Sequence, residues 1–183
     1  NDPYLICSKQ QLNNIEGSCD KSKNYLMDAD LDLASYTGAT FNLINLFTGT
    51  FNGLGHIIYN FTYNAPAVSN IGLFKFLDTG AKVEKLTLRH VNVIGQNDVG
   101  GLVGNSNNCS SISFVNVVGS VQGAARVGGI VGTLKGCTLV RSENRASVTG
   151  TFTGAALSVG GLVGYATLGA TISESFNTGV VVS

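Results

Sequence analysis

A six-residue pattern of glycine and aliphatic residues recurs three times in this chain at a nearly constant spacing. The hexads are Val99–Gly104, Val127–Gly132 and Val159–Gly164. Their first residues are 28 and then 32 positions apart, and a degenerate copy lies at Ile71–Phe74. A period of roughly 20 to 50 residues is typical of a stacked array, in which each unit packs on its neighbours. An insertion near residues 151–154 would explain the longer spacing.

The composition of each unit indicates strands rather than helices. Short runs of Val, Ile and Phe alternate with Gly, Asn, Ser and Thr, which are strand and turn residues. A propeller blade usually needs about 40 or more residues, so these units are too short for that fold. We predict an all-β fold, a right-handed parallel β-helix (β-solenoid) of about five to six coils. It occupies residues 25–183 as one continuous domain, and residues 1–24 form an N-terminal cap.

The double glycine of each hexad separates two apolar residues by three positions. If both face the core, the glycines must supply a bend between them. A phosphate-binding loop is the alternative, but such a motif occurs once and not three times in an array. Ile112, Val140 and Ile172 repeat at the same offsets as the hexads, and Asn116 and Asn144 share the shorter one. The predicted repeat core is Val99, Leu102, Val127, Ile130, Val159 and Leu162.

The first 33 residues predict a cap followed by an alternating strand. Ser8 is a candidate N-cap for a short helix over Lys9–Ile15, whose apolar face would cover the end of the core. Residues 25–33 then alternate, which leaves Asp28, Asp30 and Asp32 in an outward row. We interpret this row as a solvated strand face. A calcium site is the weaker alternative, because calcium needs converging oxygens whereas side chains on one strand face diverge. No other metal site and no cofactor are predicted.

The hexads and their surroundings resemble a known motif. Spaced by Ser/Asn/Thr-rich segments such as Ser175–Gly179, they look like the GLUG motif of large bacterial surface and secreted proteins. These include filamentous adhesins and immunoglobulin-A-cleaving metallopeptidases. Asp30–Leu33 and Phe47–Ile58 resemble the segments that precede such repeats, although Asn52 and Leu54 depart from the expected Asp-Gly-Asn-Gly-His. The resemblance implies a β-helix in an exported protein and carries over no catalytic residue.

Four cysteines fit an exported protein. Cys7 and Cys19 lie on either side of the predicted helix, and Cys109 and Cys137 occupy equivalent positions on neighbouring coils. We expect a disulfide in each pair, with free thiols as the alternative. The spacing does not favour zinc, because there is no CxxC motif. Asn60 and Asn108 begin sequons, which matter only if the source organism glycosylates its proteins.

Charge and motifs exclude several classes of function. The formal net charge is zero, which does not fit a nucleic-acid binder. The longest uncharged run, residues 146–173, is broken throughout by Gly, Ser and Thr, so we predict no membrane span. His56 and His90 are the only histidines, and neither HExxH nor GxSxG occurs. Four arginines could line a face that binds acidic sugars: Arg89, Arg126, Arg141 and Arg145. We favour the interpretation that they are ordinary solvated side chains.

The function predicted from these observations is non-catalytic. We expect a secreted or cell-surface module that acts in adhesion or as a structural spacer. Its partner would be a glycan or protein on a host or neighbouring cell, or further copies and repeats of the parent chain. The alternative is a substrate-binding accessory region of a larger secreted peptidase or carbohydrate-active enzyme. A third reading is a stand-alone polysaccharide lyase. Because Val180–Ser183 provides no polar cap, we also expect a fragment of a longer array or a last coil that pairs with another copy.

Overall fold

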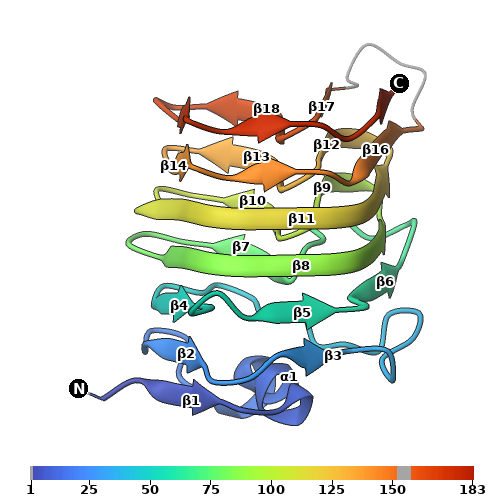
Figure 1. Cartoon of the computed structure of the whole chain (residues 1–183). Helices are drawn as coiled ribbons and strands as arrows, with labels where there is room; N and C mark the ends of the chain where they lie inside the picture. Colours follow the sequence, from blue (N-terminus) through green and yellow to red (C-terminus); the bar gives the residue numbers. More distant parts are fainter. Residues whose placement is uncertain (1, 152–157) are drawn as a thin grey trace.

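The computed structural model describes residues 2–151 and 158–183, and its fold is a parallel β-helix with one short helix at its N-terminal end (Figure 1). In this view the chain runs from left to right along the front strands. It returns behind them while it climbs, so the winding is right-handed. Every strand pairing within the described residues is parallel and joins one coil to the next. The fold predicted from the repeat is confirmed.

Three sheets form the walls of the helix. The long sheet contains β1 (Tyr4–Ile6), β2 (Tyr25–Met27), β3 (Leu31–Asp32), β4 (Thr50–Asn52), β5 (Ile57–Tyr59), β6 (Thr62–Asn64), β8 (Lys82–Ile94), β11 (Ser111–Gly123), β14 (Thr138–Val140), β15 (Glu143–Asn144), β16 (Ser147–Gly150), β19 (Thr171–Ser173), β20 (Phe176–Asn177) and β21 (Val181–Val182). The four-stranded sheet contains β7 (Phe74–Leu77), β10 (Val103–Ser106), β13 (Val131–Lys135) and β18 (Val163–Thr167). The three-stranded sheet contains β9 (Asn97–Gly100), β12 (Ala125–Gly128) and β17 (Val159–Gly160).

The hexads stack as predicted. Val99 pairs with Val127, and Val127 pairs with Val159. The second valine of each hexad forms a parallel column on the four-stranded sheet. The expected insertion near residues 151–154 lies outside the described residues apart from Thr151.

The register on the long sheet differs from the prediction by one residue. Ile112 pairs with Leu139 and not with Val140, and Asn116 pairs with Glu143 and not with Asn144. The cause is the corner after the disulfide. One residue, Ser110, lies between Cys109 and the start of β11, whereas β14 starts directly after Cys137. A corner that is shorter by one residue changes the offset from 28 to 27 on the sheet that follows.

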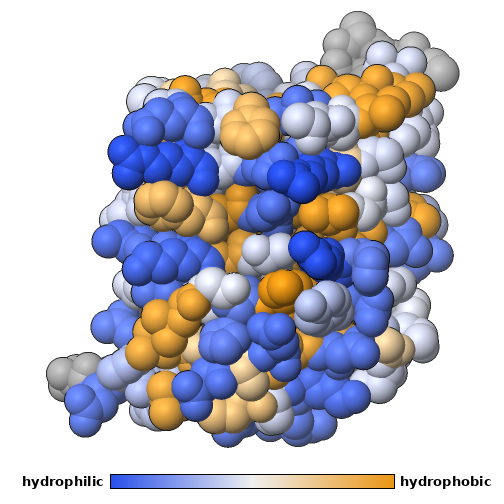
Figure 2. All heavy atoms as spheres, viewed as in Figure 1, coloured by the Kyte–Doolittle hydropathy of each residue, from blue (hydrophilic) through white to orange (hydrophobic). Residues whose placement is uncertain are grey.

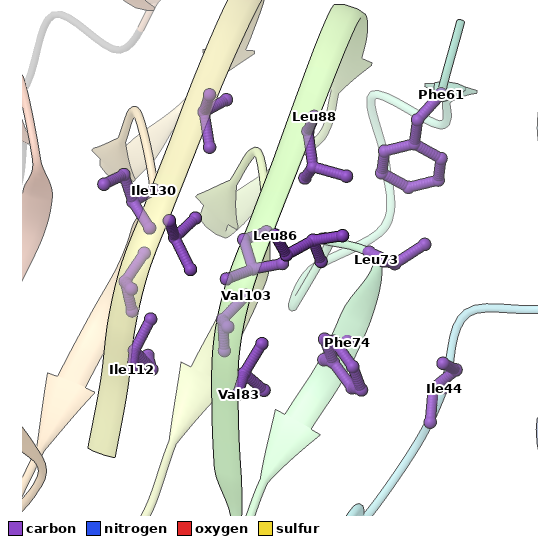
Figure 3. Close-up of a cluster of buried hydrophobic side chains, with 14 of the residues drawn as sticks. Ile44, Phe61, Leu73, Phe74, Val83, Leu86, Leu88, Val103, Ile112 and Ile130 are labelled. Carbon is purple, nitrogen blue, oxygen red and sulfur yellow. The ribbon is translucent and has the colours of Figure 1, made fainter. Parts of the chain in front are cut away.

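The core is a continuous apolar column along the axis (Figure 3). Four of the predicted core residues are fully buried: Val99, Leu102, Val127 and Ile130. The other two, Val159 and Leu162, pack against the core but are only partly buried, because no described residue covers the last coil.

The glycines of the hexads allow backbones to approach each other. A Cβ atom on Gly132 would lie 2.5 Å from the backbone nitrogen of Val99, in the hexad one coil earlier. A Cβ atom on Gly129 would overlap the side chain of Asn144. Gly132 therefore lets the two shorter sheets approach each other, and Gly129 leaves room for a side chain from the long sheet, because a Cβ at either position would push these parts apart.

The N-terminal helix α1 (Lys9–Ser18) caps the first coil. Ser8 is its N-cap, and the backbone N–H of Gln11 donates to Ser8 Oγ over 3.3 Å. Leu12 and Ile15 are fully buried, as the predicted apolar face requires. The strand expected over residues 25–33 is instead two strands, β2 and β3, with a break between them, although burial still alternates along the segment. Among the described residues, no helix is long and apolar enough to cross a membrane.

Candidate functional site

One of the two expected disulfides is present. Cys109 and Cys137 are bonded, with their Cα atoms 5.0 Å apart on neighbouring coils. Cys7 and Cys19 are free and exposed, so the expectation of a bridge across the cap is wrong. These two residues lie at opposite ends of a ten-residue helix. Such a helix is about 15 Å long, whereas disulfides need Cα atoms within about 7 Å.

Two side chains of the aspartate row, Asp30 and Asp32, form hydrogen bonds with residues of the next coil. Asp30 Oδ1 accepts from the backbone N–H of Ile57 at 2.9 Å and lies 3.0 Å from His56 Nδ1. The hydrogen bond from Ile57 is the main reason that the pKa of Asp30 is below its ordinary value. Asp32 accepts from Asn60 Nδ2 at 2.8 Å, which lowers its pKa in the same way.

The row does not form a metal site. The Oδ2 atom of Asp28 lies 3.9 Å from the thiol of Cys7, away from the partners of Asp30 and Asp32. Within residues 2–151 and 158–183, no group of three His, Cys, Asp or Glu side chains is arranged to hold a metal ion. The three carboxylates thus have separate partners and do not converge on one point, as a calcium site would require.

Three of the four candidate arginines are neutralised by carboxylates. Arg126 pairs with Asp98, and Arg141 Nε lies 2.8 Å from Glu174. Arg145 Nε lies 2.5 Å from Glu143. These pairs remove most of the positive charge that a face for acidic sugars would need.

Asp98 is the most buried charged group of this surface. Its side chain is 8% exposed, and its carboxylate accepts two hydrogen bonds of 2.7 Å from Nε and Nη2 of Arg126. The hydroxyl of Thr133 also donates to Asp98 Oδ1. The hydrogen bonds that Arg126 donates to Asp98 raise the pKa of Arg126. The cluster joins strands β9, β12 and β13, so it ties the two shorter sheets together. The pair was not predicted from the sequence, although Asp98 and Arg126 each immediately precede the first valine of a hexad.

A strip of side chains runs along the four-stranded sheet at the molecular surface; Tyr165 is exposed, whereas Thr133 is almost completely covered by its neighbours. Phe76 pairs with Asn105, Asn105 with Thr133 and Thr133 with Tyr165, one residue from each coil. We call Phe76, Asn105, Thr133 and Tyr165 the outer strip. The strip could not be predicted from the sequence, because its four residues are all of different types and so do not form a repeat.

A hollow of about 310 Å³ opens beside the outer strip. Its wall includes Leu46, Asp78, Asn107 and Lys135 together with three residues of the strip, Phe76, Asn105 and Thr133. Ligand pockets usually measure about 300–1,000 Å³, so this one is at the small end of that range. It contains an aromatic ring, amides and one charge of each sign, which are groups that can recognise a ligand.

Comparisons with known proteins place similar sequences in much larger chains. No protein-family model matches this chain. Halomucin of Haloquadratum walsbyi is 34% identical over 160 residues, covering 80% of this chain and 2% of halomucin. An immunoglobulin A1 protease of Streptococcus pneumoniae (strain ATCC BAA-255 / R6) is 32% identical over 137 residues, covering 74% of this chain and 6% of the protease. This chain matches a small part of each. The similarity therefore covers a region of those proteins and not their whole length.

A solved structure supports the fold. The crystal structure of a "putative immunoglobulin A1 protease" from Bacteroides ovatus superposes on this chain with a TM-score of 0.55. The match covers 98% of this chain and 71% of the other, at 16% sequence identity. At that identity the likeness shows a shared fold only.

Proposed function

We propose that this chain is a non-catalytic β-helix module of a larger exported protein, where it acts in adhesion and as a rigid spacer. The observation that carries the proposal is the uncovered surface of the last coil. Ile172 and Val181 are 44% and 43% exposed, whereas Leu139 and Val148, their partners one coil earlier, are fully buried. Figure 2 shows apolar residues gathered at this end of the molecule. An exposed apolar surface of this kind marks a place where a protein contacts a partner, which agrees with an adhesive role.

A column of asparagines leads to this apolar surface. Asn144 is fully buried and donates through Nδ2 to Asn177 Oδ1 at 2.7 Å. Asn177 Nδ2 donates to Gly179 O, and its second N–H has no acceptor among the described residues. Asn177 can thus donate a hydrogen bond to a partner that packs on this surface, as Asn144 donates to Asn177.

The proposed extracellular location rests on the disulfide and on the matches. Disulfides persist in oxidising environments, and Cys109–Cys137 joins two coils in the middle of the array. The matching regions belong to a halomucin and to immunoglobulin A1 proteases. The resemblance of the hexads to the GLUG motif of surface and secreted proteins agrees with this assignment.

Binding and catalysis can be tested on the purified chain. Beads coated with the chain should adhere to cells or to immobilised surface glycans and proteins, and the chain should cleave neither peptides nor polysaccharides in a broad panel. Cleavage of acidic polysaccharides would replace the proposal with the lyase reading. An accessory role in a larger enzyme is the second candidate, since four sequence matches are to immunoglobulin A1 proteases. It would be favoured if deleting this region lowered the activity of the parent enzyme while the coated beads failed to adhere.

The uncovered end can be tested separately. The isolated chain should bind a dye that fluoresces on apolar surfaces and should self-associate in sedimentation experiments as its concentration rises. A chain that stays monomeric and binds no dye would overturn the argument from the last coil.

A further inference from the structure

We propose that the outer strip and its hollow bind an uncharged oligosaccharide. This inference rests on the proposed adhesive function and names the chemical class of its ligand. Four observations carry it: the spacing of two aromatic rings, an amide with no partner, the balance of charge, and the rigidity of the surface beneath.

The two aromatic side chains of the strip are spaced along the axis of the β-helix. Phe76 and Tyr165 are separated by three coil-to-coil steps through Asn105 and Thr133. At about 4.8 Å a step, the Cα atoms of the two aromatic residues are about 14 Å apart. Tyr165 is 46% exposed, and no hydrogen bond is formed by its hydroxyl within the described residues. The C–H faces of sugar rings pack on aromatic rings, so an extended oligosaccharide could contact both.

The polar groups between the rings are available to a ligand. The side-chain amide of Asn105 forms no hydrogen bond with any described residue, although it is only partly exposed. An amide can donate to one sugar hydroxyl and accept from another. The amide of Asn107 donates to Asp78 Oδ1 at 3.1 Å, which leaves the Asn107 oxygen as a further acceptor.

The charges at the hollow favour a neutral ligand. Its wall contains one ammonium group, Lys135, and one carboxylate, Asp78. An acidic or a basic ligand would meet a like charge as well as an opposite one. Arg126, which lies one coil below the level of Tyr165, is already paired with Asp98. A ligand recognised through hydroxyl groups avoids this conflict.

The surface beneath the strip is rigid. The hydroxyl of Thr133 is bound by the buried carboxylate of Asp98, which Arg126 holds in turn. The backbone N–H of Lys135 donates to the buried Ser106 Oγ at 3.1 Å. The Thr133 side chain and the backbone at Lys135 are held in this way, so this part of the surface loses little entropy when a ligand binds.

The opposite face lacks these features and provides a matched control. Phe114 on the long sheet is 50% exposed, close to the exposure of Tyr165. The guanidinium carbon of Arg141 lies 5.6 Å from the centre of the Phe114 ring and covers it. The guanidinium therefore occupies one face of the Phe114 ring, although the side chain as a whole is as exposed as that of Tyr165.

The experiment is a glycan array probed with the fluorescently labelled chain, followed by titration of the best neutral oligosaccharide. We expect binding to neutral glycans, about tenfold weaker affinity in Tyr165→Ala and Asn105→Ala, and recovery in Tyr165→Phe. The control Phe114→Ala should bind like the unsubstituted chain. Thermal unfolding of each variant separates loss of binding from loss of folding.

Three results would overturn the inference. They are binding to acidic glycans or peptides alone, no binding to any glycan, and neutral-glycan binding that Phe114→Ala weakens more than Tyr165→Ala does. Coated beads that adhere to cells without binding any neutral glycan would refute this site and leave the adhesive function standing. If the beads adhere to nothing, the proposed function fails with it.

Discussion

The buried Asp98–Arg126 pair allows a prediction in which the two partners behave unequally. The side chain of Asp98 is 8% exposed, whereas that of Arg126 is 37% exposed. Arg126→Ala leaves a buried carboxylate with the Thr133 hydroxyl as its remaining side-chain donor. Asp98→Asn leaves a guanidinium that can turn towards water. Substituting the arginine should therefore cost more stability than substituting the aspartate.

The expected magnitudes follow from burial. Removing one partner of a buried ion pair costs about 3–5 kcal/mol, and the remaining hydrogen bond from Thr133 places Arg126→Ala near 3 kcal/mol. Asp98→Asn keeps a side chain that tolerates the positive φ of 55° at this position. It loses hydrogen bonds to a charged group, which are worth about 1.5–3 kcal/mol, and the exposure of Arg126 places the cost at the lower end.

The double variant decides the argument. Once Asp98 carries no charge, the absence of Arg126 leaves no buried charge unpaired, so the double variant should be more stable than Arg126→Ala alone. Urea unfolding followed by circular dichroism measures all four free energies of unfolding. If the single effects simply add, or if Asp98→Asn costs more than Arg126→Ala, buried charge is not what makes the arginine necessary.

Three further predictions concern the disulfide, the glycines and pH. Reducing Cys109–Cys137 should lower the free energy of unfolding by about 3.5 kcal/mol, the chain-entropy value for a separation of 28 residues, as measured by urea unfolding with and without reductant. Gly132→Ala should prevent or severely weaken folding, because its Cβ would clash with backbone atoms. Gly17→Ala within helix α1, where a Cβ would meet open space, should instead stabilise the protein by up to about 1 kcal/mol. Thermal melts of the two variants compare these effects. The bonds that lower the pKa of Asp32 below 3.8 stabilise the fold above that pH and are lost as the pH falls through the folded-state pKa. The unsubstituted chain should accordingly be more stable than Asp32→Asn at pH 6, with the difference closing towards pH 3; a constant difference would contradict this assignment.

The repeat was sufficient to predict the fold because it fixes which side chains stack. The hexad columns, the N-cap at Ser8 and the bonded pair Cys109–Cys137 all follow from equal spacing or from a local helix signal. The one-residue shift on the long sheet did not follow, because a corner can shorten without changing the hexads. Asn144 illustrates the difference. It shares the hexad offset with Asn116 but pairs with Val117.

The errors at the cap have a different cause. Cys7 and Cys19 are close in sequence but lie at the two ends of a helix, and pairing by sequence separation ignores the length of the helix. The break between β2 and β3 was missed because burial alternates through it, and alternation alone does not show where the backbone hydrogen bonds stop.

The outer strip was hidden from the sequence for a reason that also bears on function. In a β-helix, inward positions are restrained by stacking and by close approach of the backbone, as at Gly132, so they repeat. Outward positions on the same strands are free to differ, and the strip differs at every coil, from Phe76 through Asn105 and Thr133 to Tyr165. The inward positions thus fix how the coils stack, and the outward positions determine what the surface can bind. A binding site on such a protein should be sought where the repeat is least regular.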